Sequence, residues 1–180
     1  MKAVLDTCVI YPTVMREMLL GTARLGHFTP IWSARILEEW ARAARKLGPE
    51  GEAQARAEIA LTQVKWPKAE RPANDGLQAR LWLPDAADIH VLATAVAASA
   101  DTIVTVNAKD FPRNILAEEG LERRDPDSLL HGFWYNDPQG LDQLAQQVLA
   151  EANRLSGDTW TLRGLMKKAR LPRLGKALAS

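Results

Sequence analysis

The chain has 180 residues, of which 47% are hydrophobic and 25% are charged, a composition typical of a globular domain with one sizeable core. Its 23 basic and 22 acidic residues give a formal net charge of +1, so the overall charge neither demands nor excludes a nucleic-acid partner, and any such binding must come from local charge. A single cysteine, Cys8, excludes internal disulfides and multi-thiolate zinc sites. No apolar run is long enough to span a bilayer and no signal peptide is evident, so we expect a cytoplasmic protein without membrane contacts.

The first half of the chain alternates between strand and helix patterns. The expected strands cover residues 2–5 and 28–32, and the expected helices cover residues 13–25, 34–47 and 50–64. Ser33 stands at the N-cap position of the second helix, and Gly48-Pro49 ends it. The charged, proline-bearing stretch 67–76 is typical of a surface loop.

The second half continues the alternation and then becomes wholly helical. We predict a helix over 86–99 with Asp85 as its N-cap, and a buried strand over the β-branched residues 102–106. Beyond Asp125-Pro126 the expected helices cover residues 139–154 and 159–169. The whole pattern predicts an α/β fold with a central parallel sheet covered by helices, organised as a domain over 1–125 and a small C-terminal helical extension over 126–180.

Oxygen-bearing side chains follow the predicted strands, where ligand sites form in parallel sheets. Asp6 ends the first strand, Asn107 ends the strand over 102–106, and Asp110 comes shortly after it. Each has a structural alternative: Asp6 can cap a turn, and Asp110 can equally cap a short helix starting near Pro112.

Two predicted helices offer further carboxylates. Glu39 lies on the border of the apolar stripe of its helix, whereas Glu38 lies opposite, so Glu39 is the better candidate to reach into a cleft; a solvated glutamate paired with arginine is the alternative for either. Asp88 shares a face with Leu92 and other buried positions, so its carboxylate must either cap the helix start or bind a metal. His90 falls away from that stripe, as a surface or supporting residue.

These side chains offer only oxygen ligands, which suit Mg²⁺ or Mn²⁺ and disfavour zinc. We predict that Asp6 and Asp88 anchor the metal and that Glu39 and the Asn107/Asp110 pair complete the site. The candidate catalytic residues are Asp6, Glu39, Asp88 and Asp110, and the candidate supporting residues are Thr7, Thr105 and Asn107.

Four segments resemble, in order and spacing, the motif blocks of PIN-domain proteins, and the toxin branch called VapC-like is closest. The segments are Leu5–Pro12, Ile36–Trp40, Pro84–Ala93 and Val104–Pro112. The resemblance spans about residues 1–130 and implies a PIN-like three-layer αβα sandwich with Mg²⁺- or Mn²⁺-dependent ribonuclease activity.

The same resemblance implies a partner and maps the acidic site. It implies the toxin of a type II toxin–antitoxin pair, restrained by a cognate antitoxin, and it places Asp6, Glu39 and Asp88 on the acidic metal-binding positions of the family. This chain departs from the family at two positions: Cys8 stands where an asparagine is frequent, and Asn107 stands where many members have a fourth acid.

Contacts with RNA are expected from Arg16, Arg35 and the basic C-terminal segment, which has no acid after Asp158. That segment could instead dock an acidic antitoxin helix or form a frayed tail, and the sequence leaves open whether the chain acts as a homodimer. A phosphatase using Asp6 as nucleophile is disfavoured because Cys8 replaces its usual second aspartate. A non-catalytic PIN-like RNA- or protein-binding module remains the alternative function.

Overall fold

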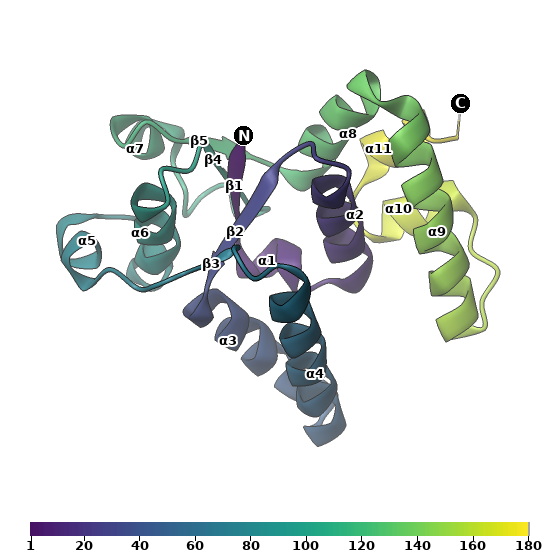
Figure 1. Ribbon diagram of the computed structural model, residues 1–180, viewed down its shortest axis with the longest axis horizontal. Coiled ribbons are helices and arrows are strands. Elements are labelled where there is room, and N and C mark those ends of the chain that lie inside the picture. The colour runs from purple at the N-terminus through teal and green to yellow at the C-terminus, as the bar shows by residue number, and fades with distance from the viewer. Residues whose placement is uncertain (180) are drawn as a thin grey trace. The chain divides into compact units, whose positions relative to one another are not determined.

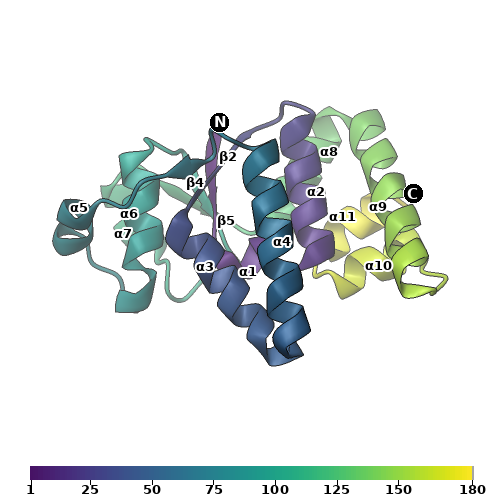
Figure 2. The same cartoon turned by 60° about the horizontal axis from the view of Figure 1, so that its bottom comes forward.

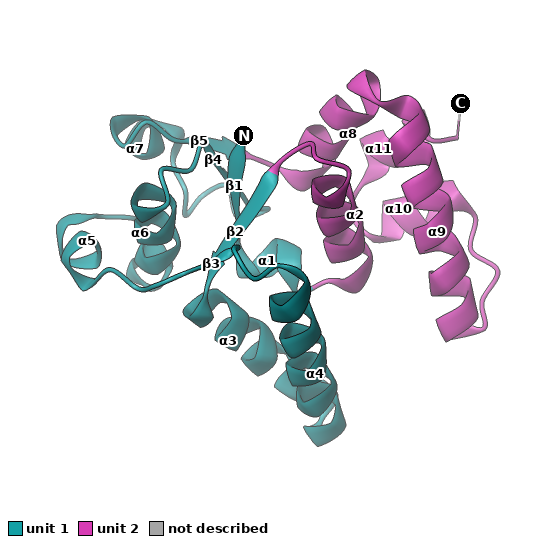
Figure 3. Ribbon diagram, in the orientation of Figure 1, with its two compact units in different colours: residues 1–11, 29–123 teal, residues 12–28, 124–180 magenta. Residues whose placement is uncertain are grey.

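The computed structural model describes residues 1–179, which group into two compact units (Figure 3). Unit 1 comprises residues 1–11 and 29–123. Unit 2 comprises residues 12–28 together with the chain from residue 124 onward. Unit 2 is therefore assembled from two segments that lie far apart in the sequence.

A five-stranded sheet forms the centre of the fold, in the order β3-β2-β1-β4-β5 (Figure 1). The strands are β1 (Lys2–Leu5), β2 (Thr29–Ser33), β3 (Glu70–Arg71), β4 (Thr102–Val104) and β5 (Glu122–Arg124). The central strand β1 pairs in parallel with β2 and β4, where Val4 faces Ile31 on one side and Ile103 on the other. All three of these side chains are fully buried, which is the environment that β-branched residues favour in a parallel sheet.

Helices and 3₁₀ turns of unit 1 connect these strands. They are α1 (Thr7–Ile10), α3 (Ala34–Ala43), η1 (Ala44–Leu47), α4 (Pro49–Lys65), α5 (Asp75–Arg80), η2 (Ala86–Asp88), α6 (Ile89–Ala97) and α7 (Arg113–Glu118). α6 packs against β1, β2 and β4, while α3 and α4 pack against each other (Figures 1 and 2). The predicted α/β fold with a parallel sheet and flanking helices is confirmed.

Unit 2 consists of helices. They are α2 (Thr13–Arg24), α8 (Pro126–Asn136), α9 (Pro138–Ser156), α10 (Leu162–Lys168) and α11 (Pro172–Ala177). α2 packs against α8 and α9, and Gly21 of α2 lies so close to Leu144 of α9 that a Cβ would collide with it. Leu165 and Leu174 are buried, so the expectation of a frayed basic tail is wrong for the described part of this segment.

Several boundaries differ from those predicted. Residues 67–76 contain the short strand β3 and the start of α5 rather than only loop, because a two-residue charged strand at a sheet edge shows no hydrophobic alternation. The helix predicted over 86–99 begins as the 3₁₀ turn η2 and ends at Ala97, and the strand over 102–106 stops at Val104. In the described chain, no helix combines the length and apolar character needed for a membrane crossing.

Candidate active site

Asp6 links β1 to α1 and is held by three donors. Only 6% of its surface is exposed. The backbone N–H of Thr7 donates to Oδ1 at 2.7 Å, and Oδ2 accepts from the hydroxyl of Thr105 at 2.7 Å and from the thiol of Cys8 at 3.1 Å. These bonds fix the orientation of a buried carboxylate and leave a lone pair on Oδ1 for a further partner.

Cys8 supports the Asp6 loop as a protonated thiol. Burial, reinforced by the negative charge of Asp6, raises the pKa of Cys8 to about 12, so the sulfur keeps the proton that it donates. Its sulfur also accepts from the backbone N–H of Val106 at 3.4 Å. The thiol therefore takes a hydrogen-bonding role beside Asp6, at the position where the resemblance leads one to expect an asparagine.

Glu39 extends from α3, whose start is capped by Ser33 as predicted. Its Oε2 accepts from the hydroxyl of Thr7 at 2.9 Å, and its Oε1 lies 3.3 Å from Arg35 Nε and 2.8 Å from His90 Nε2. Partial burial acts to raise the pKa of Glu39, but the contacts with His90 and Thr7 outweigh it, and the pKa lies below its usual range. Glu39 is thus an ionised, oriented carboxylate.

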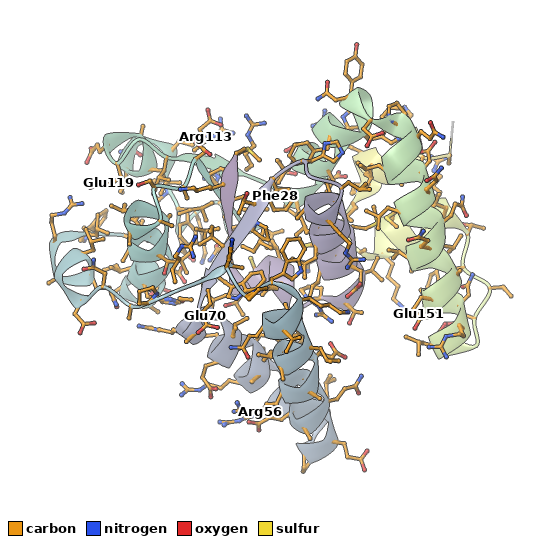
Figure 4. All side chains as sticks on the ribbon, in the orientation of Figure 1. Phe28, Arg56, Glu70, Arg113, Glu119 and Glu151 are labelled. Carbon is orange, nitrogen blue, oxygen red and sulfur yellow. The ribbon has the colours of Figure 1, made fainter. Side chains whose placement is uncertain are left out.

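Glu38, the neighbouring carboxylate, lies outside this arrangement. It pairs with Arg42 at 3.2 Å and with Arg56 of α4, which is labelled in Figure 4, at 3.0 Å. These contacts form on exposed helix surfaces, where an ion pair contributes little stability. This is the solvated, arginine-paired state that the sequence predicts for a glutamate opposite the apolar stripe.

His90 is buried, with 3% of its surface exposed, so the first of its two predicted positions, at the surface, is wrong. The second, that of a supporting residue, agrees with its contact to Glu39. Sequence periodicity cannot distinguish the two, because α6 is buried around most of its circumference, from His90 through Ala95. The sequence therefore allows His90 a supporting role without indicating that its neighbour is Glu39.

Three carboxylates gather at the start of α6. Oxygens of Asp85, Asp88 and Asp110 all lie within 4.8 Å of one another. Asp85 caps η2 by accepting from Ala87 N–H at 2.9 Å, as predicted, but its place in this group was not anticipated because capping explained it fully. Asp88 makes no capping hydrogen bond at the start of α6, and Asp110 accepts from the Asn107 amide.

The pKa of Asp88 reports how much negative charge surrounds it. Burial first, and then the charges of Asp6, Asp85, Asp110 and Glu39, raise this pKa from 3.8 to about 6. Asp6 and Glu39 are thus close enough to act on Asp88 electrostatically, although they lie outside the tight group of three. A desolvated carboxylate among like charges is stabilised by a cation, and a donor set made only of oxygen fits Mg²⁺ or Mn²⁺.

The two arginines predicted to contact RNA have different surroundings. Arg35 is 52% exposed and joins α3 to the turn before α6, since its Nη2 donates to the carbonyl of Ala87 at 3.2 Å. Arg16 lies on α2 in unit 2 with 3% of its surface exposed, and its Nε is 3.9 Å from Glu17. A guanidinium buried to this extent is withdrawn from an RNA backbone, so the structure gives no support to Arg16 as a contact.

Comparison with known proteins agrees with this architecture. The profile of a family described as PIN domain matches residues 2–109, more than half of the chain, and its range contains Asp6, Glu39, Asp85 and Asp88 but ends just before Asp110. No curated protein and no solved structure matches the chain. PIN domains are generally nucleases, so a nucleic-acid substrate is indicated. With its central parallel sheet, its carboxylate group and this match, the chain belongs to the PIN-domain family.

Proposed function

We propose that this protein is a metal-dependent endoribonuclease that hydrolyses RNA phosphodiester bonds. The observation that carries the proposal is the group Asp85, Asp88 and Asp110, whose oxygens lie within 4.8 Å of one another. The pKa of Asp88 in this group is raised to about 6. The negative charges of these carboxylates repel one another and also repel a phosphate backbone. It becomes useful for phosphodiester chemistry once a divalent cation reverses the local charge.

The residues that would hold Mg²⁺ or Mn²⁺ are Asp6 and Asp88, joined by Asp85 and Asp110. The cation supplies positive charge to the phosphate and lowers the pKa of water. Asp6 contributes a carboxylate that its three donors already hold in place, which reduces the entropy lost on binding. Asn107 restrains Asp110 in the same way through its side-chain amide.

Glu39 is the residue best placed to orient the attacking water. Contacts with Thr7 and His90 keep it ionised and oriented, so it can accept a hydrogen bond from that water. Arg35 touches Glu39 and remains half exposed, so its guanidinium is available to a phosphate oxygen of the substrate.

The decisive experiment is cleavage of single-stranded RNA by wild-type protein and by Asp88→Asn, with Mg²⁺, with Mn²⁺ and with chelator. We expect cleavage only with a divalent ion and a loss of at least about a hundredfold in Asp88→Asn, since even a change to a residue that only supports a metal ligand costs about 10–100-fold in metal affinity or activity. Asp158→Asn, the same substitution at an exposed residue of unit 2, should cleave normally.

The alternative of a non-catalytic binding module makes the opposite prediction. Wild-type protein would then bind RNA without cutting it, and Asp88→Asn would bind at least as well because a negative charge is removed. Cleavage that persists in chelator would instead overturn the metal dependence.

We further propose that the protein is the toxin of a type II toxin–antitoxin pair in the cytoplasm, restrained by an antitoxin. The support is the resemblance to the toxin branch and an exposed basic surface on α10 and α11 that includes Lys167, Lys168 and Arg173, which suits an acidic partner helix. Expression of wild-type protein should arrest growth, whereas expression of Asp88→Asn should not. Co-expression of the antitoxin should restore growth. Size-exclusion chromatography with light scattering tests separately whether the protein forms a homodimer.

A further inference from the structure

Unit 1 contains a small cavity that does not include the carboxylate group Asp85, Asp88 and Asp110. Its volume is about 110 Å³, and its wall comes from the end of β2, the start of α3, the segment from β3 to α5, and α6. Glu70, labelled in Figure 4, marks its β3 side. The polar side chains on which the inference rests are Arg35, Arg71, Asn74, Gln78 and His90.

This cavity shares a wall with the candidate active site. Arg35 and His90 line it, and both also contact Oε1 of Glu39, at 3.3 and 2.8 Å. A group bound in the cavity is therefore separated from Glu39 by the side chains of Arg35 and His90. A nucleotide whose phosphate lies at the acidic group could place its base in this cavity.

The buried wall of the cavity includes the imidazole of His90. His90 is almost completely buried, its Nε2 lies 2.8 Å from Glu39 Oε1, and neither ring nitrogen is exposed or makes a hydrogen bond of good geometry with the described residues. A ligand in the cavity therefore packs against the ring of His90 without reaching its nitrogens, so the hydrogen bonds to a ligand must come from the other polar side chains of the wall.

The open side of the cavity carries two carboxamides one helical turn apart. Asn74 uses its Oδ1 to cap α5 by accepting from Leu77 N–H at 2.9 Å, a bond that leaves its amide nitrogen unused. Gln78 is half-buried on the next turn of α5. Carboxamides offer a donor and an acceptor side by side and so match the edges of nucleobases.

The guanidinium group of Arg71 and the volume of the cavity limit the class of ligand that fits. Arg71 is fixed by donating to the carbonyl of Lys68 at 2.7 Å, and guanidinium planes stack on unpaired RNA bases. Cavities that hold drug-sized ligands measure roughly 300–1,000 Å³. A volume of about 110 Å³ suits a single heterocyclic ring better than the fused rings of a purine.

We propose that this cavity binds a pyrimidine base of the RNA strand next to the scissile phosphate, recognised by the side-chain amides of Asn74 and Gln78 and packed against Arg71 and the ring of His90. The inference rests on the proposed ribonuclease function and adds a sequence preference to it. Gln78 and Asn74 are then specificity-determining residues, since they touch the base and not the reacting phosphate.

The test is an NMR titration of Asp88→Asn protein with each of the four nucleoside 5′-monophosphates, following the side-chain amide signals of Asn74 and Gln78. We expect the uridine and cytidine nucleotides to shift these signals saturably and the purine nucleotides to bind at least about tenfold more weakly. Adding Gln78→Ala, or Asn74→Ser, which keeps a capping oxygen, should weaken pyrimidine binding by about tenfold. Gln54→Ala, on the exposed surface of α4, is the matched control and should change nothing.

Sequencing of RNA ends produced by wild-type protein from a random pool gives the second readout. Wild-type should prefer a pyrimidine at one position beside the cut, and Gln78→Ala should lose that preference because cleavage beside a pyrimidine falls by about tenfold while cleavage beside a purine changes little. Equal binding of all four nucleotides, or an unchanged preference in Gln78→Ala, would overturn the pyrimidine site while leaving the ribonuclease intact. Pyrimidine binding by a protein that cleaves no RNA would overturn the proposed function and not the site.

Discussion

Asp88 carries an energetic cost that can be measured without any substrate. In the absence of metal its pKa rises from 3.8 to about 6 on folding, because the carboxylate is partly buried beside Asp85, Asp110 and other acids. The folded state then binds protons more tightly than the unfolded state. The stability contributed by this group is fully present below about pH 4 and is lost as the pH rises through 6.

Asp88→Asn should therefore stabilise the metal-free protein at neutral pH. We expect a gain of about 1 kcal/mol in the free energy of unfolding above pH 6, after discounting the shift for solvent exposure, and almost none near pH 4. Urea unfolding in chelator at both pH values measures this gain. An equal gain at both, or a matching gain in Asp158→Asn, would show that the charge at position 88 is not the cause.

The thiol of Cys8 should react slowly in the folded protein. Its pKa of about 12 leaves little thiolate at pH 8, and the thiolate is the reactive form. We predict alkylation by iodoacetamide at least about a hundredfold slower than in urea-unfolded protein, followed by mass spectrometry. Alkylation at a free-cysteine rate in the folded state would show that burial and Asp6 do not control this thiol.

Single residues of the candidate site differ in how visible they are in the sequence. Asp88 stands out because a carboxylate on a buried stripe is costly without a cation or donors. Asp6 has an ordinary alternative as a turn cap and stands out only together with the other acids. Asp85 is already explained in the sequence as a helix cap, so nothing there indicates that it also lies next to Asp88 and Asp110. The contact between His90 and Glu39 joins residues 51 positions apart and follows only from the packing of α6 near α3.

Among the helices, α11 depends on a single buried carboxylate in α8. Asp127 is 7% exposed and accepts the backbone N–H groups of Arg173 and Leu174, both at 2.9 Å. α11 is too short to be stable alone, so this anchor and the burial of Leu174 hold it.

Asp127→Ala should detach α11. The buried N–H of Leu174 and the partly buried N–H of Arg173 would lose a charged acceptor, which costs about 2–4 kcal/mol. Hydrogen exchange followed by mass spectrometry should show faster exchange over residues 172–177, while β1 and β4 stay protected. Asp127→Asn keeps one acceptor oxygen and should have a smaller effect; equal exchange in both variants would argue against the anchor.

Elements with their own periodicity and caps are predictable, and elements made by partners are not. β1, α2 and α3 have apolar patterns and clear ends, and the sequence predicts each within one or two residues once the turn η1 is counted together with α3. β3 has two charged residues and exists as a strand only because β2 offers it an edge, with Trp32 opposite Glu70. Such induced structure leaves no local signal.

For the whole molecule, the grouping of α2 with the C-terminal helices determines which parts of the chain can be truncated without exposing an apolar face. α2 buries Leu19 and Leu20 and packs against α8 and α9 of the same unit. A composition-based boundary at residue 125 separates α2 from these partners, because hydropathy along the chain carries no information about which distant helix an apolar face meets.

A fragment of residues 1–125 should accordingly be unstable in isolation. It retains α2 but lacks every later helix of unit 2, so the apolar face of α2 becomes exposed. We expect aggregation, or a melting temperature at least about 10 °C below that of the full chain, measured by light scattering and circular dichroism. A monomeric fragment with wild-type melting would show that residues 1–125 form an independent domain.

The divided composition of unit 2 also orders events during translation. Residues 12–28 leave the ribosome first, and about 95 further residues must follow before residue 124 appears. At roughly 5–20 residues per second this delay lasts about 5–20 s, during which α2 lacks its native neighbours. The apolar face of α2 thus stays without its unit 2 partners while β1, β2 and β4 can already assemble. Unit 2 is complete only when α11 is synthesised and its backbone N–H groups bind Asp127.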